Sequence, residues 1–166
     1  MKRRRMSHVR LHQLPLSIAA SAKRESRSQF AALPFRVVDD GLQILLVTSR
    51  RTRRWILPKG WPEHGLTPAE CAAKEAWEEG GVEGKGYDMC LGVYSFEKFQ
   101  QHAPDLPVVG LVYPLKVKKV RRTWPEAKER RRKWFSPKKA AATVQQPELK
   151  RILKTFDPKV LKGPRA

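Results

Sequence analysis

The stretch from Gly60 to Val82 constrains the fold of this chain more than any other part of the sequence. Thr67 precedes Pro68, and Glu70 stands three positions after Thr67. This spacing predicts a helix that begins with a capping box and has proline at its first position. At about 100° per residue, the predicted helix has one alanine-rich side that we expect to be buried. The residues expected on that side are Ala69, Ala72, Ala73, Ala76 and Trp77.

Three glutamates, Glu75, Glu78 and Glu79, occupy the second half of the predicted helix. Helical spacing indicates that they share one outward face. Like charges three or four positions apart are destabilising, and the C-terminus of a helix also disfavours anions. A divalent cation would remove both penalties, and clustered carboxylate oxygens suit Mg²⁺ or Mn²⁺ better than zinc. The alternative is an acidic face exposed to solvent.

The same stretch resembles the Nudix box, G-x5-E-x7-R-E-U-x-E-E-x-G-U, in which U is an aliphatic residue. The alignment begins at Gly60, includes all three glutamates and ends at Gly81 and Val82. Two positions depart from the motif, because Leu66 replaces its first Glu and Lys74 replaces its Arg. By resemblance these two are supporting residues, so we expect the departures to affect rate or metal affinity and not the type of chemistry.

Resemblance to the Nudix family implies an α/β fold, an α/β/α sandwich with a mixed sheet that carries the box as a loop and a helix. It also implies that Glu75 and Glu79, often with Glu78, and the backbone carbonyl of Lys59 hold a metal ion. The implied reaction is Mg²⁺-assisted hydrolysis of a phosphoanhydride by water. Glu78 or Glu79 is a candidate for the base. Some family members recruit the base from a loop outside the box, and the candidates for that role are Glu97, Glu126 and Glu129.

Further segments resemble the family branch that hydrolyses diphosphoinositol polyphosphates and diadenosine polyphosphates. They are AALPFRV at 31–37, SRRTRRWILPKG at 49–60 and WPEAKERRRKWFS at 124–136. The second segment is rich in arginine, and guanidinium groups grip phosphate oxygens in pairs. The alternative for at least two of these arginines is a solvated basic turn. The predicted substrate-binding residues are Arg50, Arg51, Arg53, Arg54 and Lys59.

The chain is strongly basic, with a formal net charge of +19 from 35 Lys and Arg against 16 Asp and Glu. The acidic box is set between basic segments, which favours a dense polyanion such as a polyphosphorylated small molecule. Inorganic polyphosphate fits this description as well as the two substrates named above. Nucleic acid also fits the charge, although we favour it less. The alternatives are a pyrophosphohydrolase of RNA 5′ ends or nucleotide sugars, and a catalytically impaired Nudix module that binds RNA or polyphosphate.

Hydrophobic patterning elsewhere predicts strands at 35–38, 42–48, 55–57, 89–96, 108–117 and 134–135, and a helix that begins at Pro147. Asp39, Asp40 and Gly41 predict a hairpin between the first two strands. We expect a basic, disordered arm at 1–29, a Nudix hydrolase domain at 30–156 and a loose tail at 157–166.

The first residues, MKRRRMSHVRLHQLPLSIAASA, superficially resemble a secretory signal, but their apolar run is short and contains Pro15 and Ser17. No apolar run approaches the roughly 20 residues that a membrane-spanning helix needs. Cys71 and Cys90 are too few for a disulfide framework. We therefore expect a cytoplasmic protein that is not bound to membranes. No sequence feature indicates an oligomeric state.

Overall fold

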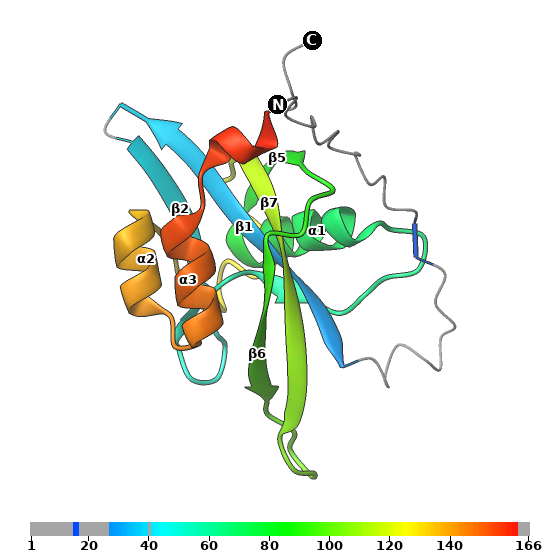
Figure 1. The fold of residues 1–166 in the computed structure, drawn as a ribbon. Helices are drawn as coiled ribbons and strands as arrows, with labels where there is room; N and C mark the ends of the chain where they lie inside the picture. Colours follow the sequence, from blue (N-terminus) through cyan, green and yellow to red (C-terminus); the bar gives the residue numbers. More distant parts are fainter. Residues whose placement is uncertain (1–14, 17–26, 40, 163–166) are drawn as a thin grey trace, which may run out of the picture.

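The computed structural model describes residues 15–16, 27–39 and 41–162, and its centre is a mixed sheet (Figure 1). Most of the arm predicted at 1–29 lies outside the described residues. The elements in chain order are β1 (Ser28–Val38), β2 (Gly41–Thr48), β3 (Trp55–Ile56), β4 (Lys59–Gly60), α1 (Pro68–Gly80), β5 (Val82–Gly86), β6 (Gly92–Lys98), β7 (Leu106–Val120), β8 (Arg132–Phe135), α2 (Pro137–Thr143), α3 (Pro147–Thr155) and the 3-10 turn η2 (Pro158–Leu161).

The sheet is mixed because its two longest strands are parallel and their neighbours are antiparallel. The strand order is β3-β2-β1-β7-β5, with β4 paired to β1, β6 to β7 and β8 to β2. β1 pairs with β7 in parallel, while the β1–β2 and β6–β7 pairs are antiparallel. The hairpin predicted after the first strand is confirmed, since Val38 pairs with Gly41. The central pairing therefore joins the start of the domain to residues far along the chain.

Helices cover both faces of the sheet, which gives the predicted α/β/α sandwich. Figure 1 shows α1 on one face and α2 with α3 on the other. Successive residues of β1 serve opposite faces, because side chains alternate along a strand. Ala32 packs in the cluster beneath α1, and Leu33 packs in the cluster beneath α2 and α3. Among the described residues, no helix is long and apolar enough to cross a membrane.

Several strands are displaced from the predicted runs or extend beyond them. β1 begins at Ser28, so two residues of the predicted arm belong to the sheet. β6 occupies 92–98 where we expected 89–96, and β7 occupies 106–120 where we expected 108–117. β5 and α2 were not predicted; β5 contains Gly84 and Gly86, which obscure the alternation typical of a strand. The segment predicted as a loose tail contains the turn η2.

Candidate catalytic site at the end of helix α1

Helix α1 begins as the sequence predicts. The Thr67 hydroxyl accepts a hydrogen bond from the Glu70 backbone N–H at 3.1 Å, and the Glu70 carboxylate accepts one from the Thr67 N–H at 2.9 Å. This reciprocal pair confirms the capping box. Ala69, Ala72 and Ala76 are buried, also as predicted. Trp77 is 38% exposed, so its predicted burial is wrong. Its position on the helix lies beyond the edge of the alanine stripe.

The three glutamates near the end of α1 occupy different environments. Glu75 and Glu78 are partly exposed, whereas Glu79 is buried with only 6% of its surface accessible. The prediction of one shared outward face is therefore wrong for Glu79. Arg130 Nη2 donates a hydrogen bond to Glu79 Oε1 at 3.1 Å. Among the described residues, Glu79 Oε2 is buried and has no hydrogen-bond partner.

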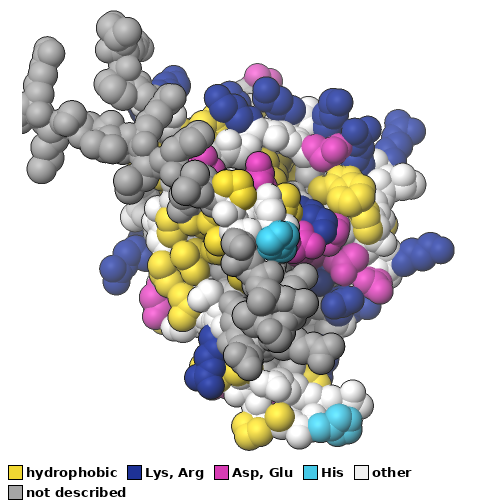
Figure 2. Space-filling view, turned by 90° about the vertical axis from the view of Figure 1, so that its right-hand side faces the viewer, with side chains coloured by type: hydrophobic (Ala, Val, Ile, Leu, Met, Phe, Trp, Pro, Cys, Tyr) yellow, Lys and Arg dark blue, Asp and Glu magenta, His cyan; other side chains and the backbone are white. Residues whose placement is uncertain are grey.

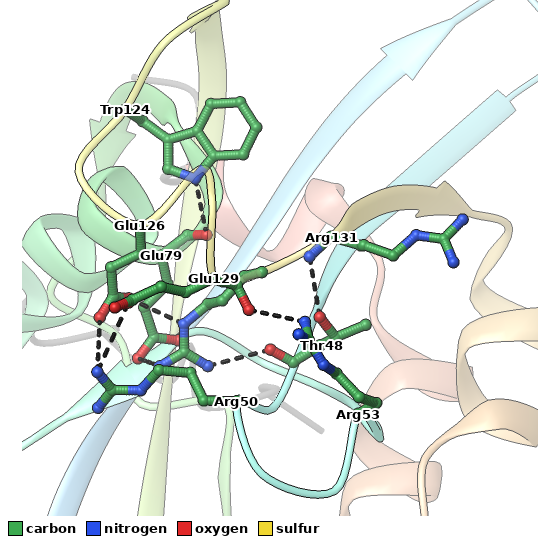
Figure 3. A network of polar contacts seen from close by, with 9 residues as sticks. Thr48, Arg50, Arg53, Glu79, Trp124, Glu126, Glu129 and Arg131 are labelled. Atoms are coloured by element: carbon green, nitrogen blue, oxygen red, sulfur yellow. Dashed lines mark hydrogen bonds and ion pairs between the residues drawn. The ribbon is translucent and has the colours of Figure 1, made fainter.

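Arg130 connects Glu79 to a second carboxylate. Its Nε donates to Glu126 Oε2 at 2.8 Å, and its Nη1 donates to the Thr48 carbonyl at 3.1 Å. Figure 3 shows this network, in which the end of β2, the end of α1 and the segment before β8 meet. Arg130 is itself buried, so its charge interacts with the two carboxylates with little screening by water. The sequence analysis did not single out Arg130, because it lies 51 residues from Glu79.

Burial shifts the pKa values of several groups in this site. The pKa of Glu79 is raised to about 7, chiefly by burial, although the charges of Arg130 and Lys59 oppose the rise. Burial and then neighbouring carboxylates raise the pKa of Glu75 to about 7. The pKa of Lys59 is lowered to about 8, chiefly by burial. Two carboxyl groups and one ammonium group of the site therefore change charge within reach of neutral pH.

Lys98, at the end of β6, is a further cation of the site that the sequence analysis missed. Burial lowers the pKa of its ammonium group, and the charges of Glu79, Arg50 and Glu75 also act on it. The ammonium lies 4.7 Å from the centre of the Trp61 ring. A single lysine at the end of a strand carries no local signal of function. Only the folding of the β6–β7 hairpin brings it near the carboxylates.

Two of the four predicted arginines of the β2–β3 loop face the segment that carries Arg130. Arg50 Nη1 lies 3.5 Å from Glu126 Oε1 and 3.6 Å from Glu129 Oε2. Arg53 Nη1 donates to the Glu129 carbonyl at 2.8 Å. Arg53 also has a φ of 55°, a left-handed conformation that is uncommon outside glycine. The loop is thus shaped by its contacts with the Glu126–Glu129 segment, as Figure 3 shows.

The other two arginines of the loop make contacts elsewhere. The Arg51 guanidinium lies 3.3 Å from the centre of the Phe99 ring, just beyond the end of β6. Arg54 Nη1 donates to Gln145 Oε1 at 3.0 Å, between α2 and α3. The structure therefore brings Arg50 closest to the carboxylates and directs Arg54 towards the helical layer.

The carboxylates of the site fit a hard divalent cation by their chemistry. Within the part of the chain that the structure describes, Glu79 Oε2 is a buried oxygen without a hydrogen-bond partner, and burial together with neighbouring carboxylates raises the pKa of Glu75. A Cβ at Gly60 would overlap Glu75 Oε1, so the carboxylate lies directly against the strand that contains Lys59. Within the described ranges, no three Asp, Glu, His or Cys side chains form a ready-made metal site. Glu79 is paired with Arg130, and Glu78 Oε1 lies 3.6 Å from Lys74 Nζ.

The C-terminus of α1 is capped by one residue of β8 and one from the segment before it. The Trp124 indole N–H donates to the Glu79 carbonyl at 3.1 Å, and Arg132 Nη1 donates to the Gly80 carbonyl at 2.9 Å. The Arg132 guanidinium also lies 3.9 Å from the centre of the Trp124 ring. Gly81 has a φ of 64°, and a Cβ there would lie 2.6 Å from Arg132 Nη1. The positive charge of Arg132 opposes the repulsion between the helix C-terminus and the glutamates.

Comparisons with known proteins agree with this geometry. The sequence matches the NUDIX domain over residues 27–156. It is 36% identical over 142 residues to Nudix hydrolase 16, mitochondrial, of Arabidopsis thaliana, covering 77% of this chain and 78% of that protein. It is 31% identical over 121 residues to human diphosphoinositol polyphosphate phosphohydrolase 3-beta, covering 72% of this chain and 70% of that protein.

Solved structures show the same fold. The crystal structure of a C. elegans Ap4A hydrolase matches with a TM-score of 0.57 and 16% sequence identity, covering 81% of this chain and 98% of that one. The family match spans the sheet, the box loop, helix α1 and both helices of the other layer. The predicted resemblance is confirmed, and the chain belongs to the Nudix hydrolases, enzymes that act on acid anhydrides.

Proposed function

We propose that this protein is a divalent-cation-dependent hydrolase that cleaves phosphoanhydride bonds in a highly phosphorylated small molecule. The observation that carries this proposal is the buried Glu79 carboxylate, which has one oxygen without a partner among the described residues and lies within reach of two cationic side chains. Arg130 contacts Glu79 directly, and the charge of Lys59 also acts on it. Figure 2 shows one face of the molecule, on which acidic side chains gather to the right of the centre with Lys and Arg side chains among and around them. Such an arrangement suits a substrate with several phosphates.

Mg²⁺ or Mn²⁺ is the proposed cofactor. We assign its binding to Glu75 and Glu79, together with Glu78 and the backbone carbonyl of Lys59. When bound, the cation would supply Lewis-acid polarisation of the phosphoanhydride and would increase the acidity of water. The residues themselves contribute carboxylates whose charged forms are disfavoured by burial, which a bound cation would offset.

Glu126 is the proposed loop-borne base, in preference to Glu97 and Glu129. Its carboxylate is held by Arg130 on the side of Glu79, and its negative charge contributes to the raised pKa of Glu79. Glu97 is exposed on β6, and the Glu129 side chain is 51% exposed. A carboxylate fixed beside the reacting centre can accept a proton from the attacking water, whereas a solvated one gains no such positioning.

The proposed substrate-binding groups are Arg50, Lys59 and Lys98, with Arg51 and Arg53 of the β2–β3 loop in a lesser role. The charge of Arg50 helps to lower the pKa of Lys98, which supports a shared role for these two cations. We propose a diphosphoinositol polyphosphate, a diadenosine polyphosphate or inorganic polyphosphate as substrate. The names of the human relative and of the C. elegans structure, which refer to the first two classes, support this choice.

A second candidate function is supported by the exposed basic surface of β7 and the residues after it. Such a surface favours polyanions in general, including RNA. The candidate is a pyrophosphohydrolase of RNA 5′ ends, or an RNA-binding module with little activity. The exposed bases of this region include Lys116, Lys118, Lys119, Arg121 and Arg122.

A substrate panel tests the proposal. Phosphate release would be measured with diphosphoinositol phosphates, diadenosine polyphosphates, inorganic polyphosphate and triphosphorylated RNA, each with Mg²⁺ and with a chelator. We expect turnover of one of the small molecules or of polyphosphate that stops with the chelator and in Glu79→Gln. Turnover of RNA alone would favour the second candidate. Binding without turnover on any compound would favour the inactive module.

We propose a cytoplasmic location for this chain. The Arabidopsis relatives that match it include proteins named as mitochondrial, so the compartment needs a direct test. Imaging of the full chain with a C-terminal fluorescent tag would decide it. Mitochondrial signal would contradict the proposal.

A further inference from the structure

The box loop, residues 61–67 between β4 and α1, is joined to helix α1 by an ion pair. Lys74 Nζ donates to both carboxylate oxygens of Glu63, at 2.7 and 2.8 Å. The Glu63 backbone N–H also donates to Cys71 Sγ at 3.4 Å. Both contacts attach the loop to helix α1. Leu66 stands where the motif has a glutamate, and the carboxylate that Lys74 contacts comes from Glu63 in the same loop.

Leu66 has a different partner, which comes from the N-terminal segment. The Leu16 N–H donates to the Leu66 carbonyl at 2.9 Å, and the Leu16 carbonyl accepts a hydrogen bond from the Gly65 N–H at 2.8 Å. The side chains of Leu16 and Leu66 both pack against the hydrophobic cluster beneath α1. A glutamate at position 66 would place a charge beside this cluster. The leucine therefore suits the contact with Leu16.

We propose that Leu16 is a positioning residue of the catalytic site, which fastens the N-terminal segment to the box loop and thereby holds the loop in place. Glu63 and Lys74 fasten the loop to α1, and Leu16 fastens it through Gly65 and Leu66. The two supports act on neighbouring residues of one short loop. The consequence for rate rests on the proposed hydrolysis, whereas the consequence for the loop does not.

The position of this loop affects the catalytic groups because it continues directly from β4. Glu75 lies against Gly60, so a shift of the loop would change the distance between the Glu75 carboxylate and the backbone carbonyl of Lys59. A misplacement of about 1 Å at a reacting centre can cost about 100-fold in rate. We therefore expect loss of the Leu16 contact to lower kcat more than it raises KM.

Two truncations separate this role from electrostatic steering. Removal of residues 1–14 deletes Lys2, Arg3, Arg4, Arg5 and Arg10 but keeps Leu16. We expect it to raise KM at low salt and to leave kcat unchanged, because long-range steering is screened by salt. Removal of residues 1–26 also deletes Leu16. We expect it to lower kcat about tenfold at both low and high salt.

Point variants in the full chain provide the decisive readout. In Leu16→Asp, the backbone amide of Gly65 should exchange its hydrogen about tenfold faster than in the unchanged protein, without metal or substrate present. Leu16→Ala should give a smaller increase if Leu16→Asp proves too unstable to study. Glu63→Gln should also increase the exchange rate at Gly65. The matched control is Glu83→Gln, which removes a charged residue of β5 that pairs with Arg121.

The exchange measurement and the rate measurement can fail separately. Unchanged exchange at Gly65 in both Leu16 variants would overturn the positioning role, whatever the enzyme hydrolyses. Faster exchange with an unchanged kcat would also overturn it, because the contact would then be structural only. If exchange is faster but the protein hydrolyses none of the panel compounds, the role of Leu16 in holding the loop is supported and the proposed function is rejected.

Discussion

The two halves of helix α1 differ in how their polar groups are satisfied. In the first turn, Thr67 and Glu70 satisfy each other by reciprocal hydrogen bonds. In the last turns, Glu79 is buried and one of its oxygens has no hydrogen-bond partner in the described ranges, while the pKa of Glu75 is raised to about 7. One helix therefore combines a start that stabilises it with an end that is electrostatically unfavourable in the absence of a cation.

The difference fits our proposal that the second half of α1 binds a cation at the expense of stability. A buried carboxylate without full hydrogen bonding destabilises a metal-free protein. Arg130 and Arg132 offset part of this cost from another segment of the chain. Mutations in the first half should therefore affect stability, and mutations in the second half should affect activity or shift stability in unusual directions.

The largest expected effect is on activity in Glu79→Gln. The amide removes the negative charge, so we expect turnover to fall by at least about 100-fold and the stabilisation by Mg²⁺ to disappear. The melting temperature of the metal-free protein should stay level or rise, because Arg130 retains Glu126 and the Thr48 carbonyl as acceptors. Thermal unfolding with and without Mg²⁺, together with a rate assay, checks both outcomes. A near-normal rate would contradict the metal assignment.

The next largest effect is on stability in Arg130→Met. This change leaves Glu79 and Glu126 without their shared cation, and breaking a buried ion pair costs about 3–5 kcal/mol. Denaturant unfolding of the metal-free protein measures the loss. In the double variant with Glu79→Gln, the loss of unfolding free energy should be smaller than in Arg130→Met alone, because no buried charge at position 79 is left without its partner. A loss below about 1 kcal/mol would show that the pair contributes little.

A pH series should test the second half of α1 through the raised pKa values of its carboxyl groups. Glu75 and Glu79 have an ordinary pKa of 4.5 that folding raises to about 7. Between these values the folded protein binds more protons than the unfolded chain, so the contribution of the two groups to stability falls as pH rises. The loss should be smaller in Glu79→Gln. Mg²⁺ should raise the melting temperature more at pH 8 than at pH 5.5, and an equal rise at both would contradict the pKa shifts.

The smallest effect is expected for Thr67→Ala in the first half. Loss of the cap should lower the free energy of unfolding by about 1 kcal/mol. Turnover at saturating substrate should change less than about twofold, since the glutamates lie at the other end of the helix. Chemical denaturation and a rate assay of the same preparation test this. A large loss of turnover in a folded protein would mean that the two halves are coupled.

Local features of the site could be read from the sequence. The capping box needs only Thr67, Pro68 and Glu70, and these residues interact within one turn. Helical geometry alone would also have predicted that Glu79 lies on the buried side of α1. At 3.6 residues per turn, a residue seven positions after Ala72 lies about 20° from it around the helix. The general expectation that charged residues are exposed led to the wrong prediction for Glu79, despite its position on the helix. The general tendency of tryptophan to be buried led to the wrong prediction for Trp77, which is exposed.

Features that depend on distant segments could not be read from the sequence. Arg130 lies in a run of basic residues that looks uniformly solvent-exposed, yet only Arg130 of the ERRRK segment is buried. Trp124, Lys98 and Leu16 reach the site or its loop only through the pairing of strands and the packing of loops. Without knowledge of those long-range contacts, one arginine cannot be distinguished from its neighbours.

The cap on helix α1 has a consequence for the order of folding during synthesis. The helix ends at Gly80, but the side chains that satisfy its last carbonyls come from Trp124 and Arg132. β1 likewise lacks its parallel neighbour until β7 has been made. A nascent chain that has emerged only as far as the box therefore contains all three glutamates but neither the cap nor the central strand pair. Assembly of the catalytic end must wait until the segment through β8 has left the ribosome.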